Sequence, residues 1–213
     1  MEISDLRTEY TRHGLSEGEL TADPMEQFRR WFESAVEAGV REPNAMTLAT
    51  VDGEGRPAAR IVLLKGAESD GFRFFTNYES AKGRELGRRP EAALVFFWSE
   101  LERQVRVEGP VERLAAQDSD AYFDSRPMES RVGAWASDQS QPIGSRAELE
   151  AKAVEVRERI DGAERVARPP HWGGYVLRPR RVEFWQGRPA RLHDRLVYRR
   201  ESQGGWSIVR LQP

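Results

Sequence analysis

The chain of 213 residues contains no cysteine, which excludes disulfides, thiolate nucleophiles and cysteine-ligated metal sites. Histidine is scarce too: His13, His171 and His193 are far apart, and no HExxH spacing occurs. We therefore expect no bound metal. A chain without cysteine also fits a reducing compartment.

Long apolar runs are absent as well. No segment approaches the ~20 consecutive apolar residues that a membrane-spanning helix needs. Residues 1–20 are polar and acidic and lack the apolar centre of a signal peptide. We expect a cytoplasmic protein with no membrane partner.

Charge is balanced in total but uneven along the chain. The net charge of -2 argues against a broadly basic nucleic-acid-binding surface. Residues 180–200 nevertheless hold seven arginines and two acids, a local excess of 7 - 2 = +5. Residues 1–22 hold five acids and two arginines. A positive cluster in a nearly neutral protein favours a small anionic ligand.

The local patterns predict one domain preceded by an arm. Residues 1–22 are expected to form a mobile N-terminal arm, and residues 23–213 a single domain. Asp23 and Pro24 form a helix start, and helical periodicity continues to about Gly39. Period-two and apolar runs predict strands at 45–51, 57–65, 71–76, 92–98, 103–114, 174–177, 181–185, 194–200 and 206–209. Further helices are predicted at 81–88, 115–124 and 146–160.

Many short strands with peripheral helices predict an α+β, mainly β fold with a β-barrel core. Strands and helices do not alternate, and neither GxGxxG nor a P-loop is present, which argues against nucleotide-binding parallel sheets. Within the second strand, we expect residues 61–64 (IVLL) to form a buried run.

Several segments are candidate anion sites. Arg60 and Lys65 flank the IVLL run, and Ser80 can cap a helix that carries Lys82. The spacing of Tyr122, Arg126 and Ser130 would place them on one helical face, although Pro127 interrupts a helix there; Gln139 and Ser140 follow in a polar loop. The alternative for each is ordinary: strand-end charges, a simple helix cap, a surface arginine or a plain loop.

Residues 183–195, EFWQGRPARLHDR, form the most informative segment. Arg191, His193 and Arg195 alternate, so on an extended strand they would share one face. Cations beside tryptophan suit a flat phosphorylated ligand, and a solvated strand edge is the alternative.

These segments, in order, resemble the pyridoxine/pyridoxamine 5'-phosphate oxidase family. The similarity is carried by EFWQGRPARLHDR and by ARIVLLKG, FFTNYES, RQVRVEGPVE, YFDSRP, GAWASDQS, HWGGYVL and RLQP, and it covers residues 7–213. It implies an FMN-binding split β-barrel of Greek-key type, assembled as a homodimer with FMN at the interface.

The resemblance also implies site residues. Those expected to bind FMN are Arg60, Ile61, Val62, Leu63, Leu64, Lys65, Phe75, Thr76, Lys82, Gln104, Gln139, Ser140, Trp185 and Arg195. Those expected to bind substrate are Arg7, Tyr10, Lys65, Tyr122, Arg126, Ser130, Arg191, Leu192 and His193, with Arg191 and His193 next to the reacting carbon. Ala81 stands where family members commonly carry arginine, which predicts weaker FMN binding unless another arginine substitutes.

The implied activity is oxidation of pyridoxine 5'-phosphate and pyridoxamine 5'-phosphate to pyridoxal 5'-phosphate, with O2 as acceptor and H2O2 as product. Two alternatives stay open: a sister flavin oxidase acting on a phenazine-type substrate, and a non-catalytic protein that binds flavin or pyridoxal phosphate. Retention of the phosphate-binding candidates argues against the first alternative.

Overall fold

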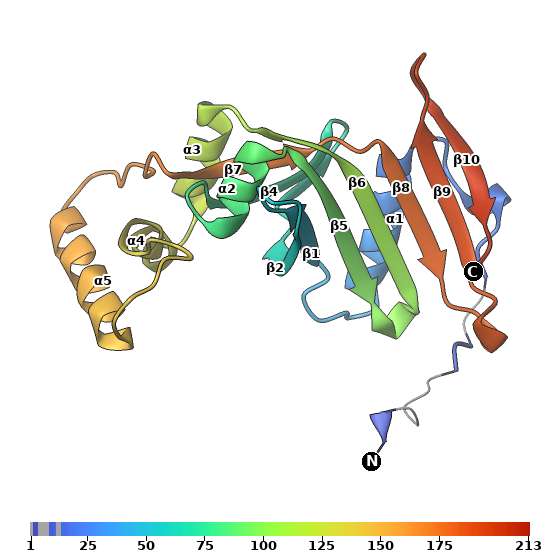
Figure 1. The fold of residues 1–213 in the computed structure, drawn as a ribbon, viewed down its shortest axis with the longest axis horizontal. Helices are drawn as coiled ribbons and strands as arrows, with labels where there is room; N and C mark the ends of the chain where they lie inside the picture. Colours follow the sequence, from blue (N-terminus) through green and yellow to red (C-terminus); the bar gives the residue numbers. More distant parts are fainter. Residues whose placement is uncertain (1, 4–8, 12–13) are drawn as a thin grey trace.

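The protein is built on a curled antiparallel sheet (Figure 1). The computed structural model describes residues 2–3, 9–11 and 14–213. Seven strands follow the order β10-β9-β8-β6-β5-β1-β2, while β3 pairs with β4, β4 with β7, and β7 with β6. The strands are β1 (Ala45–Val51), β2 (Pro57–Leu63), β3 (Gly66–Glu68), β4 (Gly71–Asn77), β5 (Glu91–Trp98), β6 (Arg103–Arg113), β7 (Trp172–Leu177), β8 (Arg181–Gln186), β9 (Asp194–Arg200) and β10 (Trp206–Leu211). The predicted α+β, mainly β class is confirmed.

Strand β6 connects the two parts of the sheet. Its first residues pair with β5 and β8, and its last three pair with β7. At the change of partner, a Cβ on Gly109 would lie 2.0 Å from the carbonyl oxygen of Arg178. Only glycine allows this close backbone approach, so the change of partner at this point depends on that residue.

The core lies between the inner face of the sheet and helix α1 (Pro24–Glu37). Asp23 caps α1 by accepting a hydrogen bond from the Met25 backbone N–H (3.0 Å), and Pro24 opens the helix, as predicted. Phe28 and Trp31 of α1 are buried against inward-facing strand residues such as Val107. The period-two pattern of β6 therefore faces its valines inward, as the sequence indicates.

The described residues leave apolar side chains exposed on the outer face of the sheet. The prediction that residues 61–64 form a buried run is wrong: Ile61 is 66% exposed and Leu63 38% exposed, while Val62 and Leu64 turn inward. Phe97 of β5 is 55% exposed. Successive apolar residues do not reveal which faces of an edge strand are covered, because that depends on neighbours distant in sequence. An exposed apolar face of this kind marks an interaction surface.

Four further helices are α2 (Ala81–Arg88), α3 (Ala116–Ser125), α4 (Met128–Ala136) and α5 (Arg146–Ile160), of which α3 packs on β7 and α2 on β1. Figure 1 shows α4 and α5 set to one side, at the end of the molecule opposite β10. Helix α5 packs on α4 through Val156, Val132 and Ala136. Helix α3 ends at Ser125, and Pro127 leads into α4, so the interruption expected at this proline is present.

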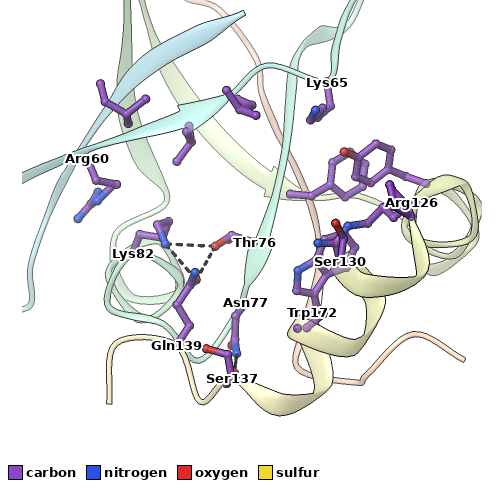
Figure 2. Close-up of a pocket in the computed structure, with 18 residues that line it drawn as sticks. Arg60, Lys65, Thr76, Asn77, Lys82, Arg126, Ser130, Ser137, Gln139 and Trp172 are labelled. Atoms are coloured by element: carbon purple, nitrogen blue, oxygen red, sulfur yellow. Dashed lines mark hydrogen bonds between the residues drawn. The ribbon is translucent and has the colours of Figure 1, made fainter. Parts of the chain in front are cut away.

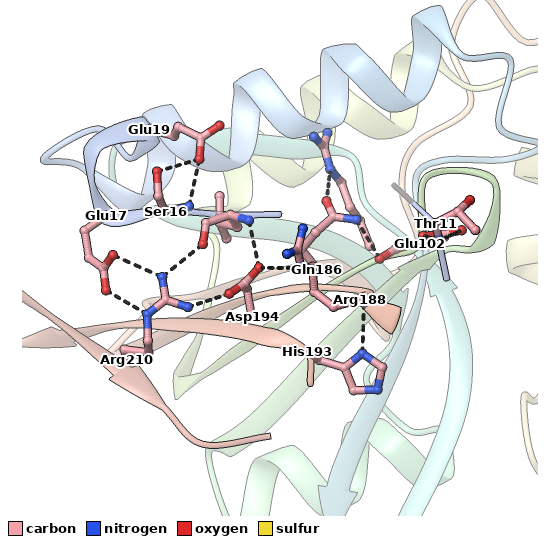
Figure 3. Close-up of polar contacts among 12 residues, drawn as sticks. Thr11, Ser16, Glu17, Glu19, Glu102, Gln186, Arg188, His193, Asp194 and Arg210 are labelled. Atoms are coloured by element: carbon pink, nitrogen blue, oxygen red, sulfur yellow. Dashed lines mark hydrogen bonds and ion pairs between the residues drawn. The ribbon is translucent and has the colours of Figure 1, made fainter. Parts of the chain in front are cut away.

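Residues 15–17 lie against β9 and β10 (Figure 3). Arg210 of β10 binds both Glu17 carboxylate oxygens (2.8 and 3.0 Å), Asp194 (2.6 Å) and the Leu15 carbonyl oxygen (3.0 Å). The Arg210 hydrogen bond lowers the pKa of Glu17 to about 2. The division into an arm and one domain stays a prediction. Among the described residues, no helix has both the length and the apolar character needed to cross a bilayer.

Candidate functional site

A cavity of about 770 Å³ opens beside the edge strand β2 (Figure 2). It is bounded by β2, β4 and the helices α2, α3 and α4. It brings together many of the residues predicted from the sequence: Arg60, Ile61, Val62, Leu63, Lys65, Phe75, Thr76, Lys82, Tyr122, Arg126, Ser130 and Gln139. Cationic side chains occupy two opposite ends of it, with apolar strand residues between them (Figure 2).

The first cationic end consists of Lys82 and Arg60. The Lys82 amino group lies 3.1 Å from the Gln139 side-chain oxygen and 3.3 Å from the Thr76 hydroxyl. Burial, and then the charge of Arg60, lower the pKa of Lys82. Because the hydrogen-bond partners of Lys82 are neutral, its charge is available to an anion.

Arg60 is held in place by groups outside the cavity. Its guanidinium donates to Glu85 (2.7 Å), to the Leu48 carbonyl oxygen (3.3 Å) and to the Thr50 hydroxyl. The Arg60–Glu85 pair is mostly buried, with side-chain exposures of 20% and 12%. Two cations and one carboxylate leave this end with a net positive charge, as an anion site requires.

Helix α2 supplies no arginine to the cavity. Ser80 caps the helix by accepting from the Gly83 backbone N–H (3.2 Å), as predicted. The Arg84 guanidinium donates to the Glu79 carbonyl oxygen, and Arg88 lies over Gly53. Neither arginine lines the cavity. Neither therefore replaces the arginine that family members commonly carry at the position of Ala81.

The second cationic end is formed by Lys65 and Arg126, with Ser130 beside them (Figure 2). The Arg126 guanidinium lies over the Trp172 ring, 4.5 Å from its centroid. The rings of Phe75 and Tyr122 stack with centroids 3.8 Å apart. Within the described structure, Nη1 of Arg126 is buried and has no hydrogen-bond partner. A buried donor without a partner is costly, and an anion in the cavity would satisfy it.

A second cluster lies elsewhere on the sheet. The register places Gln104 opposite Trp185, and Trp185 opposite Arg195, so the three side chains form a row on the outer face. The Trp185 ring contacts the rings of His193 (centroids 4.6 Å apart) and Tyr10 (5.6 Å). We call Tyr10, Gln104, Trp185, His193 and Arg195 the tryptophan cluster.

The tryptophan cluster does not line the cavity of its own chain. Strands β1 and β5 lie between β2 and β6, which places Gln104 three strand spacings, roughly 14 Å, from β2; Trp185 is four spacings away, roughly 19 Å. Ile61 and Leu63 of the cavity nevertheless lie on the same outer face as the tryptophan cluster, because Ile61 is in the same cross-strand row as Glu183, two residues before Trp185. The residues that the resemblance assigns to one site therefore form two separate groups in a single chain, the cavity lining and the tryptophan cluster.

The turn before β9 has an unusual backbone. Strand β9 begins at Asp194, as predicted, so Arg191 and His193 precede it and do not share a strand face with Arg195. Arg191 instead ends a short 3-10 turn in which Ala190 and Arg191 have φ of 55° and 62°. Left-handed backbone at two successive non-glycine residues is strained, and such strain is typical of functional sites.

The ring of His193 has a defined hydrogen-bonding state (Figure 3). The Arg188 backbone N–H donates to its Nδ1 atom (3.1 Å). Nδ1 is therefore the acceptor, and in the neutral ring the proton is on Nε2. Partial burial, and then the charge of Arg191, lower the pKa of His193. The neutral ring with an Nε2–H donor is the state that these contacts favour at neutral pH.

Some predicted residues lie outside both groups. Leu64 is buried in the core, Ser140 is exposed with φ of 71°, and Leu192 is 69% exposed. Arg7 lies outside the described residues. The sequence analysis did not single out Asn77, Ser137 and Trp172, which line the cavity, nor Glu85, which binds Arg60. Trp172 lies in the HWGGYVL segment that carried the resemblance; spacing gave no signal for Glu85.

Comparisons with known proteins agree with the resemblance. Residues 32–160 match the family profile described as pyridoxamine 5'-phosphate oxidase. Residues 172–213 match the profile described as the pyridoxine 5'-phosphate oxidase C-terminal dimerisation region. The pyridoxine/pyridoxamine 5'-phosphate oxidase of Bordetella petrii is 59% identical over 213 residues, covering 100% of both chains. Pyridoxine/pyridoxamine 5'-phosphate oxidase 1 of Ralstonia nicotianae is 59% identical over 211 residues, covering 99% of both.

Solved structures have the same fold. PhzG from Burkholderia lata, crystallised with tetrahydrophenazine-1-carboxylic acid, superposes with a TM-score of 0.89 at 30% identity, covering 97% of this chain and 100% of PhzG. A pyridoxamine 5'-phosphate oxidase-related, FMN binding protein from Nostoc punctiforme gives a TM-score of 0.71 at 22% identity, covering 91% and 100%.

Proposed function

The chain belongs to the pyridoxamine 5'-phosphate oxidase family, and from that premise we propose that it oxidises pyridoxine 5'-phosphate and pyridoxamine 5'-phosphate to pyridoxal 5'-phosphate, with FMN as cofactor. Its fold is the split β-barrel of that family. The observation that carries the proposal is the cavity with a cationic group at each end, which suits one phosphate from the cofactor and one from the substrate.

The residues at the first end fit FMN. Arg60 and Lys82 would hold its phosphate, with Gln139 and Thr76 as polar neighbours. The edge strand from Ile61 to Leu63 would lie along the flavin ring and its sugar chain. When bound, FMN would supply the two-electron oxidation of the substrate carbon attached to the pyridine ring, with O2 as final acceptor and H2O2 as product, and with water consumed and ammonia released from the amine substrate.

The residues at the second end fit the substrate phosphate. Lys65 and Arg126 supply charge, and the Tyr122 and Ser130 hydroxyls can supply hydrogen bonds. Nη1 of Arg126, buried without a partner in the described structure, would donate to this phosphate. Binding energy from a phosphate remote from the reacting carbon orients that carbon for reaction.

A second copy of the chain would complete the site. Ile61, Leu63 and Phe97 form an apolar patch on the outer face that also carries the tryptophan cluster. In a symmetric dimer, each copy presents the same face to the other. Pairing through this face would bring the tryptophan cluster of one copy to the cavity of the other. The match of residues 172–213 to the dimerisation region supports this arrangement.

His193 of the tryptophan cluster and the nearby Arg191 would act at the reacting carbon. Arg191 would orient the substrate and stabilise negative charge that develops there. Neutral His193 would donate a hydrogen bond from Nε2, the atom left free by the Arg188 contact. In this arrangement His193 positions the substrate as a donor and removes no proton through that nitrogen.

No second function is favoured over this one. The curated oxidases are 59% identical to this chain, whereas PhzG is 30% identical. The paired cationic ends of the cavity give a phosphorylated substrate an advantage that a phosphate-free phenazine precursor lacks.

The test is a substrate panel with the purified protein. We expect a flavin absorption spectrum, and formation of pyridoxal 5'-phosphate with O2 consumption from both phosphorylated substrates. Dephosphorylated pyridoxine and tetrahydrophenazine-1-carboxylic acid should react far more slowly. Arg191→Ala should lower turnover about 10²-fold while flavin stays bound, the scale of a lost electrostatic contact. A protein that binds flavin but oxidises neither phosphorylated substrate would contradict the proposal.

A further inference from the structure

Glu183 is the centre of an ion-pair network on the outer face of β6, β8 and β9. Its side chain is 1% exposed, although it lies on the same outer face as the exposed Ile61 and Phe97. One carboxylate oxygen accepts from Nε of Arg195 (2.8 Å). The other accepts from Nη2 of Arg181 (2.6 Å) and lies 3.7 Å from Nη1 of Arg106. Arginine side chains thus cover a carboxylate that would otherwise face solvent.

Glu183 is ionised at neutral pH. Burial alone would raise its pKa, but the hydrogen bond from Arg195 and the charges of Arg195, Arg106 and Arg181 outweigh burial and lower it. A buried ion pair is weak evidence for stability, because apolar residues of similar volume often stabilise a protein as well or better. Stability alone therefore does not explain why a carboxylate is buried among these arginines.

Arg195 is the partner of Glu183 that belongs to the tryptophan cluster. Its Nε atom is bound to Glu183, and its Nη1 atom donates to the Gln212 carbonyl oxygen (3.1 Å). These two contacts fix the plane of the guanidinium from two sides. In the described structure, neither of these two contacts involves the third nitrogen, Nη2. Arg195 lies directly across from Trp185, so the outer-face row continues from the indole to the guanidinium.

We propose that Glu183 is a positioning residue, which holds the Arg195 guanidinium in the orientation that binds the flavin. This inference rests on the proposed function, because the flavin would lie in the cavity of the partner copy. A guanidinium fixed beforehand loses less conformational freedom when the ligand binds, so the ligand binds more tightly. Without the carboxylate, Arg195 would keep its charge and lose its orientation.

The network contains a matched control. Glu108 accepts from Arg106 (2.9 Å) and Arg181 (2.6 Å), two arginines that also surround Glu183. No contact between Glu108 and Arg195 is present in the described structure. Glu108→Gln therefore removes the same charge from the same network and leaves the Glu183–Arg195 contact intact.

The experiment is a titration of flavin-free protein with FMN, followed by quenching of flavin fluorescence. We expect Glu183→Gln to weaken FMN binding about 10-fold or more, the scale of a charge-assisted hydrogen bond. Glu108→Gln should stay within about 2-fold of wild type, as expected for a partly exposed pair. Glu183→Asp, which keeps the charge but withdraws it from Arg195, should also weaken binding, and it serves if Glu183→Gln does not fold.

A double-mutant cycle with Arg195→Met separates positioning from general damage. If Glu183 acts through Arg195, Glu183→Gln adds no further loss of FMN affinity in the Arg195→Met background. The visible flavin spectrum of bound Glu183→Gln should shift in the same direction as that of Arg195→Met. Additive losses, or unchanged FMN affinity in both Glu183 variants, would overturn the inference alone. Failure of the wild-type protein to bind FMN would overturn the proposed cofactor as well.

Discussion

The Lys82 amino group lies 3.1 Å from the Gln139 side-chain oxygen, although 57 positions separate the two residues. Strand β4 makes this possible, because its residue Thr76 donates to the same Gln139 oxygen (3.1 Å). The contact joins α2 to the loop after α4 and closes one end of the cavity. Since both hydrogen-bond partners of Lys82 are neutral, its charge is available to an anion, whereas Arg60 at the same end is paired with Glu85.

Replacing Lys82 should therefore weaken cofactor binding. We expect Lys82→Met to raise the Kd for FMN roughly 10- to 100-fold, since it removes a charge-assisted contact from a half-buried site. Lys152→Met is the control, because Lys152 pairs with Asp138 near the same loop but is 39% exposed. Equilibrium titration with FMN is the measurement, and equal affinities for the two variants would exclude Lys82 from the phosphate site.

Replacing Arg126 should affect substrate more than cofactor. The Arg126 guanidinium is held over Trp172 with a buried donor that lacks a partner in the described structure. We expect Arg126→Met to raise the KM for pyridoxine 5'-phosphate by about 10²-fold, the scale of a lost hydrogen-bonded charge. The KM for dephosphorylated pyridoxine should change little. Arg146→Met, on the exposed face of α5, is the control. Equal effects on both substrates would show that Arg126 does not bind the phosphate.

The pH dependence of His193 can be observed directly. Partial burial and Arg191 lower its pKa, so the folded protein resists protonating it. The unfolded chain then binds more protons, and His193 favours unfolding as the pH falls through the unfolded pKa of about 6.5. We expect the NMR signal of the His193 ring to titrate below that value in wild type and at higher pH in Arg191→Ala. A pKa at or above 6.5 in wild type would contradict this.

The apolar patch on the outer face should control assembly. Phe97 is 55% exposed in one copy and would be buried in the proposed dimer. Because a charge in a buried interface is strongly unfavourable, Phe97→Asp should give monomers that bind FMN poorly. Val36→Asp, on α1 and 54% exposed, should leave the dimer intact. Light scattering after size-exclusion chromatography measures the mass, and a dimeric Phe97→Asp variant would place the interface elsewhere.

Ala81 offers a gain-of-function test. The cavity lining contains no arginine from α2, because Arg84 binds the Glu79 carbonyl oxygen and Arg88 lies over Gly53. We expect Ala81→Arg to lower the Kd for FMN several-fold, about the effect of one added charge-assisted contact at a partly exposed site. The same titration measures it. No gain would mean that Arg60 and Lys82 already satisfy the phosphate.

Local signals in the sequence predicted much of the fold. Caps such as Asp23 and Ser80, and period-two alternation around Val105, depend on near neighbours and are found as expected. Exposure of Ile61 was not predictable in this way, because it depends on which strand faces are covered. The left-handed turn at Ala190 and Arg191 was missed for a different reason. Glycine is the usual signal of left-handed backbone, and neither residue is glycine.

The family resemblance predicted the site residues and a cofactor at a dimer interface, but the local patterns did not show that these residues form two groups in one chain. Segments around Arg60 and Trp185 both carry the family resemblance, and nothing in their spacing shows that three strands separate them in one chain. Partners such as Glu85 and Glu183 were missed because their contacts cross between elements. Strand order, which brings distant segments together or keeps them apart, is the information that local patterns lack.

The central claim is that each site combines the cavity of one copy with the tryptophan cluster and Arg191 of another. Mixed dimers of Arg126→Met and Arg191→Ala test it directly, with substrate below the wild-type KM. Random pairing would make half of the dimers mixed, each with one intact site, so activity should recover to about a quarter of wild type. Activity no higher than the mean of the two separate variants would show that both residues act within one chain, and would contradict the claim.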